Sequence, residues 1–272
     1  MPDDPVTSNP WATNPWQRDS AREAAVDGEV AGGIWGWAVA AATAERNAGA
    51  DAGVDDGTAE QSSDDVYASL TAEWPPVEPL IERHITASDH YEVFEYWKDH
   101  WRRKDKPDDK VWCFDFAQYQ LHIAGFRGIG TGSDPTSYFQ LFLVRRDDDG
   151  ARIDETDIGR TAEGVEYLKD RLQRGTPVLL GLRLAWHRKD YNPDSTTNHY
   201  VVVVGMGSDA EGGPYGGRYY FTYYDYKFAE PQRFYLYNVP TLALHSFKDD
   251  KRHRESGVAL RRASQIRYTV RE

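Results

Sequence analysis

The feature that most restricts the fold of this 272-residue chain is a series of apolar and aromatic runs in its C-terminal half. The runs are rich in valine, leucine, tyrosine and phenylalanine, and the loops between them are rich in glycine, aspartate, asparagine and proline. This alternation is typical of β-strands joined by turns, and it allows neighbouring strands to pair antiparallel. We therefore expect strands at residues 177–184, 200–205, 219–225 and 233–237, with an edge strand around residues 266–270.

Helices are predicted where apolar residues recur at intervals of three and four positions. One helix should begin just after Cys113. A second should be capped by Ser88 or Asp89, and a third should be capped by Thr161 and stopped by Gly175. Helices and antiparallel strands together predict an α+β fold.

Charge divides the chain into two parts. The net charge is -12, and residues 1–65 alone hold 13 acidic and 3 basic side chains. We expect residues 1–65 to form an acidic arm and linker rich in Trp and Ala, and residues 66–272 to form one domain. No basic stripe with interleaved aromatic residues is present, so we expect no nucleic-acid partner.

The most apolar stretch of the first hundred residues is 32–42, which is too short to span a bilayer and lacks a basic lead-in. We expect neither a Sec signal nor a transmembrane helix, and no stable membrane insertion. The expected location is the cytoplasm of the producing cell, with export only through a dedicated secretion system.

Cys113 is the single cysteine, which excludes a disulfide within the chain and a cysteine-only zinc site. At a helix start, unpaired backbone N–H groups and the helix dipole stabilise a thiolate, so Cys113 is a candidate nucleophile. The alternative is an inert, buried thiol.

His199 and Asp225 are the candidate partners of this cysteine. His199 precedes a run of four valines, which would hold the imidazole rigidly at the start of a strand while it still reaches solvent as a base. His187 is the nearest competitor, in a polar loop. Asp225 interrupts an aromatic strand and can approach the imidazole; burial there needs a partner. The alternatives are a histidine that merely starts a strand and an acid that faces water.

The order of these motifs resembles the papain-like cysteine hydrolase superfamily over roughly residues 105–240. The motifs are a helix-start cysteine, Gly-Thr-Pro-Val-Leu-Leu-Gly-Leu, Asn-His-Tyr-Val-Val-Val-Val-Gly and Tyr-Phe-Thr-Tyr-Tyr-Asp. The nearest branches are bacterial leader-processing peptidases and type VI secretion peptidoglycan amidases. The resemblance implies an N-terminal helical part, with Cys113 as nucleophile at a helix N-terminus packed on an antiparallel sheet, His199 as base and Asp225 as orienting acid. Pro107 stands where many such enzymes have an oxyanion glutamine.

The function that this resemblance implies is Cys-His-Asp acyl transfer on an amide. The foremost expectation is a peptidoglycan amidase or endopeptidase of the antibacterial effector type, with a peptide or peptidoglycan substrate and a cognate immunity protein. One alternative is a protein-directed cysteine peptidase or transglutaminase-like acyltransferase. Another is a non-catalytic papain-like binding or scaffold domain. No metal or organic cofactor is required by this chemistry, and the glycine-rich residues 125–132 lack the context of a dinucleotide loop.

Overall fold

The computed structural model describes seven segments of the chain: residues 62–100, 110–129, 138–146, 152–184, 196–238, 241–248 and 259–272. All of them belong to one compact unit. Residues 1–61, which include most of the expected arm and the apolar stretch 32–42, lie outside the described residues, as do Pro107 and His187. Helix α3 (Ser63–Thr71) starts with a cap from Ser62, so the last three residues assigned to the arm are helical.

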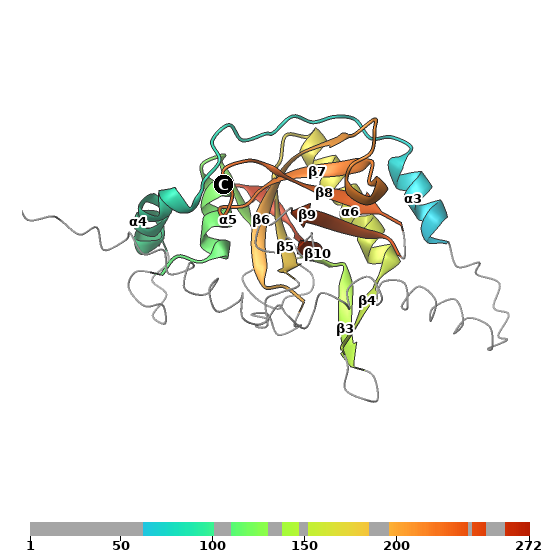
Figure 1. The fold of residues 1–272 in the computed structure, drawn as a ribbon. Coiled ribbons are helices and arrows are strands. Elements are labelled where there is room, and N and C mark those ends of the chain that lie inside the picture. Colours follow the sequence, from blue (N-terminus) through green and yellow to red (C-terminus); the bar gives the residue numbers. More distant parts are fainter. Residues whose placement is uncertain are drawn as a thin grey trace, which may run out of the picture. The chain divides into compact units, whose positions relative to one another are not determined.

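The described residues combine helices with antiparallel strands, which confirms the α+β class (Figure 1). The remaining helices are η2 (Ala87–Asp89), α4 (His90–His100), α5 (Cys113–His122), α6 (Ile158–Gln173) and η4 (Pro214–Gly216). The strands are β1 (Phe126–Gly128), β2 (Tyr138–Gln140), β3 (Phe142–Arg146), β4 (Arg152–Thr156), β5 (Val178–Leu184), β6 (His199–Ser208), β7 (Tyr219–Tyr224), β8 (Gln232–Tyr237), β9 (Ala243–Lys248), β10 (Ala259–Arg267) and β11 (Thr269–Arg271).

Six strands close into an antiparallel barrel in the order β5-β6-β7-β8-β9-β10, because β10 pairs with β9 on one side and with β5 on the other. The expected edge strand around residues 266–270 is therefore wrong. Ile266 lies in β10, paired with both β5 and β2, and residues 269–271 form β11, which pairs with β1. The physical reason is backbone pairing: Ile266 is fully buried, and at a sheet edge its buried N–H and C=O groups would lack ladder partners.

Strands β5 and β6 contain long apolar runs, at residues 178–182 and 201–204, because both of their faces are covered. One face joins the larger core cluster with α3 and α6, and the other packs on α5 through Leu179, Val202 and Val204. Successive residues of a strand point to opposite faces. Each strand therefore contributes to both clusters in turn.

The N-cap of helix α6 lies four residues before the expected cap. Asp157 is the N-cap, and its side chain accepts a hydrogen bond from the backbone N–H of Arg160. Thr161, the residue predicted to cap this helix, is fully buried one turn inside it, where its hydroxyl donates to the carbonyl oxygen of Asp157. Gly175 follows the helix with a φ of 74°, as expected for a left-handed stop.

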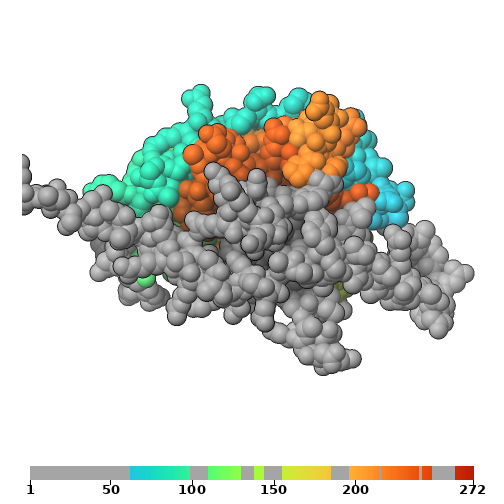
Figure 2. All heavy atoms as spheres, viewed as in Figure 1, coloured from blue at the N-terminus to red at the C-terminus, as the bar shows by residue number. Residues whose placement is uncertain are grey.

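Residues 74–89, which we call the strap, run from α3 to α4 along the side of the barrel formed by β6 and β7 (Figure 1). Val77 forms an isolated antiparallel bridge with Met206, and the Leu80 N–H donates to the carbonyl oxygen of Val204 at 2.8 Å. In the space-filling view the blue-green residues of this region lie against the orange strands (Figure 2). Within the described residues, every helix is too short or too polar to cross a bilayer.

Candidate active site

His199 and Asp225 meet at one end of the barrel. His199 is the first residue of β6, and Asp225 directly follows the last residue of β7. The imidazole Nε2 lies 3.0 Å from a carboxylate oxygen of Asp225, and both side chains are almost fully buried. By alternation, His199 shares the face of Val201 and Val203, which belong to the larger core cluster. His199 therefore lies inside the barrel end; it does not reach solvent as the sequence led us to expect.

Arg261, on strand β10, is a third residue of the buried cluster around Asp225, and it was not predicted from the sequence. Its Nη1 donates to the second carboxylate oxygen of Asp225 at 3.1 Å, and only 4% of its side chain is exposed. The guanidinium also lies over the ring of Phe228, with 4.4 Å from its carbon to the ring centre. The alternation of side chains along a strand could have indicated that Arg261 is buried, because it places Arg261 on the same face as the buried Ala263.

Burial and charge act in opposite directions on the Asp225 carboxyl. Burial alone would raise its pKa, but His199 and Arg261 hold that pKa well below its usual range, so Asp225 is a carboxylate. Burial lowers the pKa of His199, although Asp225 opposes this effect. The resting imidazole is therefore neutral at pH 7.

Cys113 is the first residue of α5, and its side chain is partly buried. The backbone N–H of Tyr200, the residue after His199, hydrogen-bonds the sulfur. Cys113 also packs against the core cluster that contains Tyr226. The Tyr226 ring stacks on Phe116 at 4.3 Å and lies 5.8 Å from the His199 ring, centre to centre. The structure thus places all three predicted residues around the start of β6 and the segment after β7.

The electrostatics of the thiol differ from the expectation for a helix N-terminus. Burial raises the pKa of Cys113 to about 11, and the backbone N–H of Tyr200 and the charge of Lys227 only partly oppose this effect. The resting cysteine is therefore a thiol at neutral pH. Any nucleophilic chemistry here requires a base that takes the proton during attack.

The first turn of α5 is fixed by reciprocal hydrogen bonds. The Trp112 N–H donates to the Asp115 carboxylate at 2.8 Å, and the Asp115 N–H donates to the Trp112 carbonyl oxygen at 2.9 Å. The first N–H groups of any helix have no intrahelical acceptor. Cys113 and Phe114 are the first two residues of α5, and N–H groups at a helix start are suited to binding an oxyanion.

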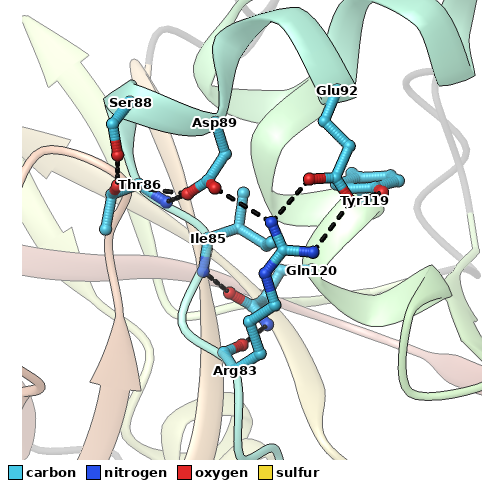
Figure 3. A network of polar contacts seen from close by, with 8 residues as sticks. All are labelled: Arg83, Ile85, Thr86, Ser88, Asp89, Glu92, Tyr119 and Gln120. Carbon is cyan, nitrogen blue, oxygen red and sulfur yellow. Dashed lines mark hydrogen bonds and ion pairs between the residues drawn. The ribbon is translucent and has the colours of Figure 1, made fainter.

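The strap anchors the last turn of α5 to the barrel (Figure 3). Gln120 is buried and bonds the strap twice, accepting from the Ile85 N–H at 2.6 Å and donating to the Arg83 carbonyl oxygen at 2.7 Å. The strap also reaches the other half of the site, because the Ala87 N–H donates to the carbonyl oxygen of Tyr226 at 2.8 Å. One segment therefore contacts both the helix that carries Cys113 and the turn that carries Asp225.

A small cavity lies between the strap, α5 and the barrel. It is lined by Ile85, Phe116, Ala117, Gln120, Tyr200, Tyr224 and Tyr226. The lining residues are mainly aromatic. Two of them are close to the thiol: Tyr200 hydrogen-bonds it through its backbone N–H, and Tyr226 belongs to the core cluster on which Cys113 packs.

Across the described segments, His, Cys, Asp and Glu side chains nowhere gather in threes in a way that could hold a metal ion. Comparison with protein-family models, with curated proteins and with solved structures found no match. The functional argument therefore depends on the residues themselves.

Proposed function

We propose that this protein is a cysteine-dependent amide hydrolase with Cys113 as nucleophile, His199 as general base and Asp225 as the orienting acid. The observation that carries the proposal is the buried hydrogen bond from His199 Nε2 to Asp225 at 3.0 Å. The next residue, Tyr200, hydrogen-bonds the Cys113 sulfur through its backbone N–H. A papain-like arrangement of helix and sheet is part of this proposal.

The hydrogen bond to Asp225 selects the tautomer of the imidazole. An ionised carboxylate can only accept, so the proton of neutral His199 is on Nε2, and Nδ1 is left with the lone pair that can take a proton from the thiol. In the proposed acylation step, Nδ1 takes the Cys113 proton while the sulfur attacks the carbonyl carbon. The N–H groups at the start of α5 stabilise the oxyanion.

Collapse of the tetrahedral intermediate breaks the C–N bond, and the imidazolium gives its proton to the leaving amine. Water, activated by the same imidazole, then hydrolyses the thioester and restores the thiol. Because the resting pair is a thiol and a neutral imidazole, the proton moves within the attack step and not before it. The thiolate and imidazolium are transient in this scheme.

The proposed substrate is peptidoglycan, cleaved at an amide of its peptide. This choice follows from the resemblance to secreted bacterial amidases, together with the acidic residues 1–65. A protein-directed peptidase or acyltransferase uses the same three residues. The distinction therefore lies in the substrate and not in the chemistry.

The test is incubation of the full chain with purified peptidoglycan and, separately, with denatured casein, followed by mass spectrometry of the released fragments. We expect new amine and carboxyl ends from peptidoglycan only, and loss of at least about a hundredfold in rate in Cys113→Ala and His199→Ala. His122→Ala, at the partly exposed C-terminal end of the same helix, is the matched control and should retain activity. Unchanged cleavage by Cys113→Ala would refute the proposal.

A non-catalytic binding domain is the second candidate, and the raised pKa of the Cys113 thiol favours it. In that case neither substrate is cleaved, and Cys113→Ala leaves the protein's behaviour unchanged.

A further inference from the structure

Arg261 occupies the point at which the barrel closes. In β10 it pairs with Leu184 of β5 on one side and with Ser246 of β9 on the other. Its side chain lies on the inner side of this closure and ends on the Asp225 carboxylate. The register that closes the barrel therefore also sets where the guanidinium meets the candidate site.

The ion pair between Arg261 and Asp225 is not explained by stability alone. Both side chains are almost completely buried, and desolvating two such charges costs about as much as their attraction returns. Apolar residues of similar size would hold a barrel end equally well. The pair also has a specific orientation, because Asp225 accepts from His199 with one oxygen and from Arg261 with the other.

The hydrogen bonds continue beyond Arg261 into the barrel. Its Nη1 lies 3.3 Å from the Tyr223 hydroxyl, which lies 2.9 Å from the Ser246 hydroxyl. Asp225 is further fixed by the Lys227 N–H at 3.1 Å. The carboxylate is thus held by donors from its own turn, from β6 and from β10, and has little freedom to rotate away from the imidazole.

We propose that Arg261 is a positioning residue of the candidate active site, which fixes the Asp225 carboxylate against His199 from the closing strand of the barrel. A role of Arg261 in catalysis rests on the proposed hydrolase function. The effect of Arg261 on the geometry and protonation of the His199–Asp225 pair is independent of that function.

The consequence is electrostatic as well as geometric. Besides Arg261, the charged and titratable groups around the pair are Lys227 and Tyr226 after β7, Tyr223 on β7, Cys113 and Asp115 on α5, and His84 on the strap. Without the guanidinium, the buried negative charge of Asp225 would be offset mainly by protonation of His199. Removal of Arg261 should therefore make the imidazole easier to protonate.

The experiment is an NMR titration of the full chain labelled with 15N-histidine, in which the His199 signals are assigned as those lost in His199→Asn. We expect Arg261→Gln to raise the His199 midpoint by about one pH unit, and Arg261→Lys, which keeps the charge, to change it by less than about 0.3 unit. Arg174→Gln is the control, since Arg174 forms an exposed ion pair with Asp170 at the end of α6. An unchanged midpoint in Arg261→Gln would overturn the proposal.

The titration does not need activity, so the two proposals can fail separately. A raised midpoint in a protein that cleaves no substrate leaves the positioning role intact and removes the hydrolase function. Where cleavage is present, the acidic limb of kcat/KM should move upward with the NMR midpoint.

If Arg261→Gln does not fold, Arg261→Lys carries the test, because a single ammonium replaces the planar guanidinium that now bridges Asp225 and Tyr223. Its spectrum should then show weaker protection of the His199 Nε2 proton from solvent exchange, by about tenfold. Protection equal to that of the unmodified chain would refute the positioning role.

Discussion

At the scale of single residues, the sulfur of Cys113 offers the most direct measurement. Burial raises the pKa of this thiol to about 11, so the thiolate fraction should rise about tenfold per pH unit through the whole range from pH 7 to 10. We expect the rate of alkylation by iodoacetamide to rise in the same way, without levelling off. Whole-protein mass spectrometry reports this rate without ambiguity, because the chain has one cysteine. A plateau below pH 8 would instead show a thiolate stabilised by the helix.

Asp225 should be far more important for stability than an acid in an exposed ion pair. Replacement by Asn removes the charge that compensates the buried Arg261, which should lower the free energy of unfolding by about 3–5 kcal/mol. Asp170→Asn is the matched comparison, because its partner Arg174 is 69% exposed, and it should cost at most about 1 kcal/mol. Urea denaturation of the two variants measures the difference. Equal losses would mean that the buried pair contributes no more than a surface pair.

At the scale of elements, the attachment of α5 to the strap depends on Gln120 more than on the charged residues around it. Figure 3 shows Arg83 between Asp89 and Glu92, but the Arg83 side chain is 51% exposed. Gln120, by contrast, satisfies two backbone groups of the strap and is 2% exposed. We expect Gln120→Ala to cost about 2–3 kcal/mol, because it leaves a buried N–H and carbonyl without their partner, and Arg83→Gln at most about 1 kcal/mol.

Thermal and urea unfolding of these two variants provide the measurement. The backbone carbonyl of Arg83 that accepts from Gln120 is present in both variants, so the comparison isolates the side chains. The reverse order of destabilisation would show that the exposed ion pairs, and not Gln120, hold the strap on α5.

Elements with strong local signals could be predicted from the sequence. Strands β5 to β8 were expected within a few residues because their apolar runs are continuous, and the start of α5 was expected from its periodicity. The cap of α6 was misplaced because Asp157 and Thr161 are both good capping residues, and what decides between them is tertiary: Thr161 is buried and its hydroxyl donates to the carbonyl oxygen of Leu141. Strand β9 (Ala243–Lys248) was missed because its sequence, Ala-Leu-His-Ser-Phe-Lys, is neither a continuous apolar run nor a regular alternation of apolar and polar residues.

At the scale of the whole molecule, closure of the barrel could not be predicted because it depends on pairing between distant segments. Nothing local to β10 says that it pairs with both β5 and β9, so the arrival of Arg261 at Asp225 was not foreseen. The pairing of His199 with Asp225 could be predicted, because β6 and β7 are consecutive strands along the chain. The candidate site was thus predictable where neighbouring strands build it and hidden where the closing strand completes it.

One buried and two partly buried histidines predict how stability responds to acid. Burial lowers the pKa of His199 and of His84, and burial together with Arg262 lowers that of His245 to about 3. These groups bind protons more readily in the unfolded chain, where the pKa of histidine is about 6.5. Their contribution to folding is therefore complete above about pH 6.5 and is lost as the pH falls towards the folded values.

His245 allows this prediction to be tested away from the candidate site. It lies on β9, paired with Tyr235 of β8 and Arg262 of β10. Between pH 7.5 and 5, protonation of His245 in the unfolded chain alone should lower the free energy of unfolding by about 2 kcal/mol, because its pKa is about 6.5 there and about 3 in the folded protein. In His245→Gln this part of the pH dependence should disappear, while the parts due to His199 and His84 remain. Urea denaturation at the two pH values measures the slope; an equal slope in both proteins would mean that His245 titrates normally in the folded barrel.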